Sequence, residues 1–194
     1  MMRGFSLTPG AIFVLSAIYF FGGLSCLAAM LASVCAHEAG HALCVKLLGG
    51  KVRSLRFDSS GLCMDTSGLL TPRAELAAIF AGPVTGLAFA ALCAYFGVST
   101  QLRFFNRTAI MSLALNIYNL IPALPLDGGR ALLLLLSGRE NARRAIGLCG
   151  VVSGLISALL GLAMLSSPVG AALTLAGVWI LIAQTGIVKN MRMM

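Results

Sequence analysis

Charged residues are scarce in this chain. Asp, Glu, Lys and Arg make up 10% of its 194 residues, whereas soluble domains usually carry about 25%. Hydrophobic residue types make up 59%, and the mean hydropathy is +0.96. A chain this apolar has too little polar surface to stay in water, which predicts a membrane protein with the lipid bilayer around it. At about 20 residues per span, the length allows at most about six or seven crossings.

Acidic residues are the rarer of the two charged classes. Six Asp and Glu stand against 14 Lys and Arg, which gives a net charge of +8. The basic residues fall between apolar runs, the pattern that sets membrane orientation, so we expect no nucleic-acid partner. The six cysteines lie mostly inside apolar stretches and show no CxxC spacing. They predict no disulfide framework and suit small, weakly polar residues of membrane spans.

The apolar runs predict an all-α membrane protein with about six transmembrane helices and a short β-hairpin after the second. We expect residues 1–194 to form a single domain with a core at about 24–136. The first apolar run resembles an uncleaved signal-anchor, and Gly22-Gly23 is the expected break between the first two spans. The hairpin falls within 49–74, with strands at 51–57 and 61–67. The predicted spans are 5–22, 24–48, 75–97, 108–122, 145–165 and 169–188.

The basic residues predict an orientation for these six spans. An even number of spans places both termini on one side. With that side taken as the cytoplasm, every Lys and Arg except Arg103 and Arg107 falls in a cytoplasmic segment, as the positive-inside rule requires. The sequence therefore predicts a multi-pass protein of the bacterial cell membrane with cytoplasmic N- and C-termini.

The chain has only two histidines, and both lie in His37-Glu38-Ala39-Gly40-His41. Positions i and i+4 share one face of a helix, so both imidazoles can reach one metal ion. Imidazole nitrogens bind zinc well, zinc lowers the pKa of bound water, and Glu38 is placed to accept the proton. The alternative is a polar cluster that hydrogen-bonds between helices, although ionisable groups in a membrane span cost at least about 2.5 kcal/mol.

A catalytic zinc ion usually takes three protein ligands, and the chain has no third histidine. Asp127 is one candidate, because it lies among apolar residues, follows Pro122 and Pro125, and precedes Gly128-Gly129. It could also cap a helix that starts near Gly129. Glu75 and Glu140 are the alternatives, although Glu75 suits a helix N-terminus and Glu140 lies in a basic loop. In the predicted topology, His37, His41 and Asp127 all fall toward the cytoplasmic side.

The combination of HEAGH with NLIPALPLDGGR at 119–130 closely resembles the site-2 protease family of intramembrane zinc metalloproteases. The compact layout resembles the branch that processes a sporulation sigma-factor precursor. The resemblance covers roughly residues 30–135. It implies a zinc cofactor held by His37, His41 and Asp127, with Glu38 as catalytic base.

The resemblance also concerns two asparagines. Asn119 matches a position that the family commonly fills with Asn, which implies that it orients the substrate or stabilises the oxyanion. The alternative is an interhelical hydrogen bond. Asn116 is a weaker candidate. The chain departs from the family at 82–86, which reads Gly-Pro-Val-Thr-Gly without the common Asn, and it lacks a further Asn earlier in the fourth span.

The function predicted is hydrolysis of a peptide bond in or near the membrane segment of a protein substrate, such as a membrane-associated transcription-factor precursor. Strand 51–57 could pair with an unwound substrate segment through an exposed edge. Two alternatives stay open: a membrane zinc protease of another class with a Glu as third ligand, and a non-catalytic metal-binding or transport protein. The sequence leaves the substrate, the oligomeric state and any regulatory membrane partner open.

Overall fold

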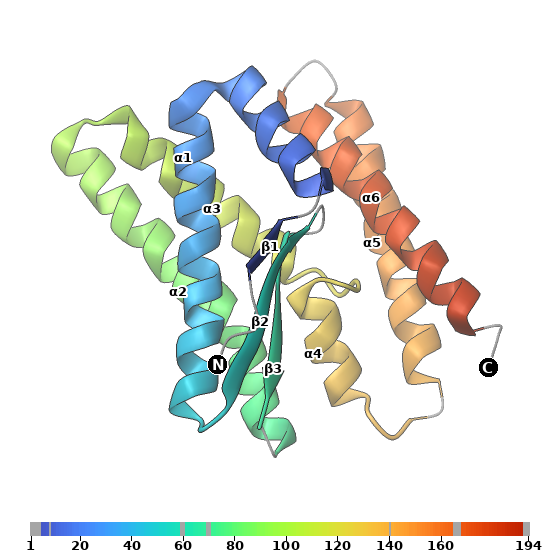
Figure 1. The fold of residues 1–194 in the computed structure, drawn as a ribbon. Helices are drawn as coiled ribbons and strands as arrows, with labels where there is room; N and C mark the ends of the chain where they lie inside the picture. Colours follow the sequence, from blue (N-terminus) through green and yellow to red (C-terminus); the bar gives the residue numbers. More distant parts are fainter. Residues whose placement is uncertain are drawn as a thin grey trace. The chain divides into compact units, whose positions relative to one another are not determined.

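The computed structural model describes residues 5–7, 9–58, 61–68, 71–139, 141–164 and 168–191. These residues form two compact units, one up to Tyr118 and one from Asn119 onward. Figure 1 labels their helices and strands. The first unit contains β1 (Phe5–Leu7), α1 (Pro9–Leu47), β2 (Lys51–Asp58), β3 (Gly61–Ser67), α2 (Pro72–Thr100) and nearly all of α3 (Arg103–Asn119). The second contains α4 (Asp127–Leu135), α5 (Ala142–Ala163) and α6 (Pro168–Met191). The single domain 1–194 stays a prediction.

Helix α1 is bent at a glycine, and the bend is visible in Figure 1. Gly23 has φ 72° and ψ 179°, a conformation that residues with a side chain rarely adopt. The predicted break at Gly22-Gly23 is therefore confirmed. The predicted start of the first span at Phe5 is wrong, because Phe5–Leu7 forms strand β1 and the helix begins at Pro9.

Three helical segments among the described residues are long and apolar enough to cross a membrane: Ile18–Leu47, Pro72–Thr100 and Ala142–Ala163. A shorter apolar helix covers Leu173–Gln184. These segments correspond to the second, third, fifth and sixth predicted spans, and the count of six crossings stays a prediction. Large apolar side chains on them are exposed, such as Leu47 at 77% and Leu159 at 64%. Such side chains suit contact with lipid better than contact with water.

The segment predicted to form a loop at 98–107 is largely helical. Helix α2 continues to Thr100, and α3 begins at Arg103 and ends at Asn119, short of the predicted Pro122. The hydroxyls of Ser99 and Thr100 donate to carbonyls four residues back, at 2.9 and 2.7 Å. Polar side chains that satisfy themselves on their own helix do not end it, which explains the wrong loop assignment.

The strands form one three-stranded sheet in the order β1-β2-β3. Strand β1 pairs in parallel with Leu55–Phe57 of β2, and β2 pairs antiparallel with β3 from Lys51↔Ser67 to Asp58↔Gly61. Residues 59–60, between β2 and β3, lie outside the described part. The sequence predicts an exposed edge for substrate at strand 51–57. The middle position of β2 corrects this expectation, because β1 occupies one edge of that strand over residues 55–57. The edge that the described sheet leaves open along its whole length is that of β3.

In the second unit, the last helix holds the loop that leads into α4. Gln184 of α6 is 1% exposed and donates from Nε2 to the carbonyl of Leu124 at 2.6 Å. The loop also folds back on the start of α4, because a Cβ on Gly128 would meet the backbone of Leu120, and one on Gly129 would meet Ala123. These contacts fix the backbone on both sides of Asp127.

Candidate metal centre

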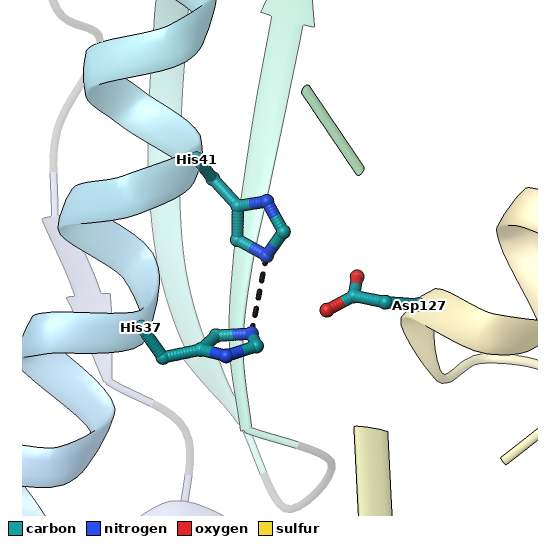
Figure 2. A group of neighbouring side chains, drawn as sticks. All are labelled: His37, His41 and Asp127. Carbon is teal, nitrogen blue, oxygen red and sulfur yellow. Dashed lines mark hydrogen bonds between the residues drawn. The ribbon is translucent and has the colours of Figure 1, made fainter. Parts of the chain in front are cut away.

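The two histidines of α1 point to the same side of the helix (Figure 2). Their Nε2 atoms face each other at 3.1 Å, and the ring planes are 82° apart. Both side chains are buried, with His37 4% and His41 8% exposed. The spacing of four residues predicted this shared face, and the structure brings the two imidazoles together as expected.

The remaining ring nitrogens show which tautomer each histidine adopts. His41 Nδ1 lies 2.7 Å from the carbonyl oxygen of Ala78 on α2, and His37 Nδ1 lies 2.7 Å from Oδ1 of Asn116 on α3. Both partners are acceptors, so each Nδ1 must carry the proton and donate it. Nε2 of each ring is then the nitrogen that suits a metal ion.

The Nε2 atoms of the two rings lie 3.1 Å apart. Zinc binds imidazole nitrogen at about 2.0–2.1 Å in tetrahedral geometry, which separates two such nitrogens by about 3.3 Å. The observed separation is close to this value. The second nitrogen of a metal-bound histidine usually donates to a carbonyl or carboxylate, as both do here. The donor set fits a zinc ion.

Glycines bring α2 close to the histidine-bearing face of α1. A Cβ on Gly82 would overlap the ring of His41, and a Cβ on Gly40 would meet the carbonyl of Ala81 and the side chain of Thr85. The close approach places the Ala78 carbonyl within hydrogen-bond distance of His41. Gly40 and Gly82 therefore allow α1 and α2 to approach closely because they have no side chain.

Glu38 is half-buried on α1, next to His37 and three residues before His41. Residues three apart on a helix are neighbours, so its carboxylate and the two imidazoles share one contiguous arc of the helix. A carboxylate beside a metal site can accept a proton from water. The local structure therefore agrees with the base role that the sequence predicted for Glu38, which stays a prediction.

Asp127 lies in the second unit, as the first residue of α4 (Figure 2). It is 6% exposed, and its Oδ1 lies 3.6 Å from Arg130 one turn later. The predicted helix start near Gly129 is therefore two residues late, and Leu126 is the N-cap. A carboxylate in the first turn of a helix is stabilised by the helix dipole. Its role as third ligand stays a prediction.

The other candidates have different positions. Asn119 is half-buried at the last residue of α3, and its predicted role is untested. Glu75 is exposed in the first turn of α2, where it suits the helix N-terminus, and Glu140 lies outside the described residues. Asn116, predicted to be the weaker asparagine, contacts His37 directly. Its signal in the sequence is an Asn one turn after Ser112 on the same helix.

Comparison with known proteins agrees with this geometry. A family model described as Peptidase M50B-like matches residues 10–123, and one described as Peptidase family M50 matches residues 96–160. The first match covers more than half of the chain. The chain belongs to the M50B-like peptidase family. The resemblance to site-2 proteases is thereby confirmed at the level of the family, and the sporulation branch stays a prediction.

Curated relatives of this M50B-like chain are longer proteins. The zinc metalloprotease Rip3 of Mycobacterium tuberculosis is 31% identical over 175 residues, which cover 84% of this chain and 44% of Rip3. The zinc metalloprotease sll0528 of Synechocystis is 36% identical over 109 residues, 53% of this chain and 29% of that protein. The chain thus spans less than half the length of either relative.

A solved structure shares the fold of this family member. The site-2 protease from Methanocaldococcus jannaschii superposes with a TM-score of 0.71 at 21% identity, over 96% of this chain and 92% of that one. The predicted helical membrane architecture is supported at this level.

The glycine at position 82 provides a test of the histidine geometry. Gly82→Ala should displace the His41 ring, because the new Cβ would overlap it, and zinc bound per purified chain should fall at least about tenfold at limiting zinc. Gly147→Ala on α5 is the matched control, since its Cβ would meet nothing within 4 Å. Equal zinc content in both variants would contradict the geometry.

Proposed function

We propose that this chain is an intramembrane zinc metalloprotease, which hydrolyses a peptide bond in or near the membrane segment of a protein substrate. The observation that carries the proposal is the pair of buried imidazoles with facing Nε2 atoms. They lie in Ile18–Leu47, a helix apolar enough to cross a membrane. The names of the zinc metalloprotease relatives support the same chemistry.

His37, His41 and Asp127 are the proposed zinc ligands. All three are buried, and each offers one ligand atom, an imidazole nitrogen or a carboxylate oxygen. Two histidines and a carboxylate, with one position left for water or substrate, form an established catalytic zinc set. When bound, zinc polarises the substrate carbonyl and lowers the pKa of water.

Glu38 is the proposed general base. Its carboxylate accepts the proton of the attacking water and then passes it to the amine that leaves when the peptide bond breaks. The half-buried position of Glu38, between the two ligand residues in the chain, supports this role. Asn119 is proposed to hold the substrate or the developing oxyanion, a role for which its carboxamide can donate.

The active site is proposed to lie toward the cytoplasmic side, with both termini in the cytoplasm. Leu47, where α1 ends, is ten positions after His37, and this corresponds to about 15 Å of helix. Lys46, Lys51 and the other basic residues that follow the helix support a cytoplasmic end there. The proposed substrate is a membrane-associated protein, such as a transcription-factor precursor.

An extended substrate segment is proposed to pair with the sheet. Strand β2 is in the middle, so the open edge of β3, Gly61–Ser67, is the place for an added strand. Pairing would hold an unwound peptide in the extended form that a protease needs.

The role of Glu38 is tested by Glu38→Gln. The amide keeps the size of the side chain but cannot accept the proton, so cleavage of a co-expressed membrane substrate should fall by at least about 10²-fold. Zinc content should stay at the wild-type level, because the ligands are intact. Unchanged cleavage would rule out Glu38 as the base, and loss of zinc would make it part of the metal shell instead.

The third ligand is tested by comparing Asp127→Asn with Glu75→Gln and Glu140→Gln. Loss of a ligand carboxylate should release most of the zinc, so Asp127→Asn should be depleted after dialysis against a chelator while the two Glu variants keep their metal. Depletion of Glu75→Gln or Glu140→Gln, with zinc retained in Asp127→Asn, would assign the ligand to a glutamate.

The open edge of β3 is tested with prolines at two adjacent positions, Cys63→Pro and Met64→Pro. In an antiparallel strand, successive N–H groups point to opposite neighbours, so one proline removes a bond to β2 and the other removes a donor at the open edge. The variant whose proline lies at the open edge should keep zinc and thermal stability but lose cleavage. Full cleavage in both variants would exclude strand pairing here.

A further inference from the structure

A buried polar contact in the first unit has no part in the predicted mechanism. Asn116 on α3 is 0% exposed, and its Oδ1 lies 2.7 Å from His37 Nδ1. Its Nδ2 lies 2.6 Å from the carbonyl of Ser112 and 3.4 Å from the Ser112 hydroxyl. A single amide therefore connects the backbone of α3 to a histidine on α1.

The contacts leave only one orientation for this amide. The Ser112 carbonyl can only accept, so it takes the Nδ2 donor of Asn116 and directs Oδ1 toward His37. A flipped amide would place an oxygen against the Ser112 carbonyl and a donor against the Nδ1–H of His37. Oδ1 therefore accepts a hydrogen bond from the Nδ1–H of His37, and Nε2 is the ring nitrogen that faces His41.

The space around the amide is equally restricted. A Cβ on Gly86 of α2 would overlap the carboxamide of Asn116. The Ser112 hydroxyl donates to the Gly86 carbonyl at 2.8 Å, and Ser112 is 0% exposed. Gly86 thus leaves room for the carboxamide between α2 and α3, and the hydrogen bond of Ser112 joins these two helices.

We infer that Asn116 is a positioning residue for the metal centre, which fixes the ring orientation and the Nε2 tautomer of His37. The inference rests on the proposed metal binding by His37. It assigns to Asn116 a role distinct from that proposed for Asn119, which is half-buried. Partners that orient a metal-bound histidine typically change metal affinity by about 10–100-fold when they are removed.

A purely structural role makes a different prediction. If Asn116 only joined α1 to α3, zinc affinity would follow the stability of the protein. If it positions His37, zinc affinity follows the presence of an acceptor at Oδ1, whatever happens to stability. Asn116→Asp and Asn116→Leu separate these two outcomes.

Asn116→Asp keeps an oxygen for the His37 proton and loses the donor to Ser112, whereas Asn116→Leu has a similar size and loses both. Full-length variants would be purified in detergent, and zinc affinity measured by competition with a chelator, beside thermal unfolding. We expect Asn116→Asp to be less stable with near-wild-type zinc affinity, and Asn116→Leu to bind zinc about 10–100-fold more weakly.

The matched control is Thr108→Val. Thr108 is also buried on α3, and its hydroxyl donates to the carbonyl of Phe104 on the same helix at 2.8 Å. The variant removes a buried hydrogen bond without touching His37, so zinc affinity should not change. If Asn116→Leu does not fold, Gly86→Ala tests the same point, because its Cβ displaces the carboxamide while Asn116 stays.

Wild-type zinc affinity in Asn116→Leu, or equal loss in Asn116→Leu and Asn116→Asp, would overturn the inference. Failure of the proposed function gives a different result, since His37→Ala would then bind zinc as the wild type does. Weak binding in His37→Ala with full binding in Asn116→Leu would refute only the role of Asn116.

Discussion

The constraint on which the metal centre depends is the burial of two imidazoles in an apolar helix. Buried polar groups need hydrogen-bond partners, and each ring here has two nitrogens to satisfy. The carbonyl of Ala78 and the carboxamide of Asn116 take the two Nδ1 protons. Each ring thereby presents its Nε2 atom to the other ring at 3.1 Å, a separation that suits two nitrogen ligands of one zinc ion. Hydrogen bonds within the first unit thus hold both imidazoles in an orientation that suits metal binding.

Glycines make these two hydrogen bonds possible, because α2 must come close to the ring of His41 and to the carboxamide of Asn116. Gly82 leaves room for the His41 ring, and Gly86 leaves room for Asn116. The departure from the family pattern at 82–86 now has a structural counterpart. The site-2 protease resemblance leads one to expect an Asn soon after Gly82-Pro83; here the carboxamide that lies against this stretch of α2 comes from α3.

The sequence predicts those features of the fold and of the metal centre that depend on residues close together in the chain. The i, i+4 spacing of His37 and His41 and the Gly22-Gly23 break were predictable because each depends on local backbone geometry. The contact between Asn116 and His37 could not be predicted, because it depends on which residue α3 presents to His37, and spacing along the chain carries no such information. The same limit applies to β1, whose apolar Phe5–Leu7 extends a hydrophobic run in the sequence but pairs with β2 fifty residues later.

The hydrogen bond from Gln184 to Leu124 has a consequence for biogenesis. The segment that enters α4 gains this anchor only from a residue 60 positions downstream, in helix α6. During synthesis, residues 120–126 must wait for α6 to insert before this contact can form. The loop that precedes Asp127 therefore reaches its final geometry only after translation has passed Gln184.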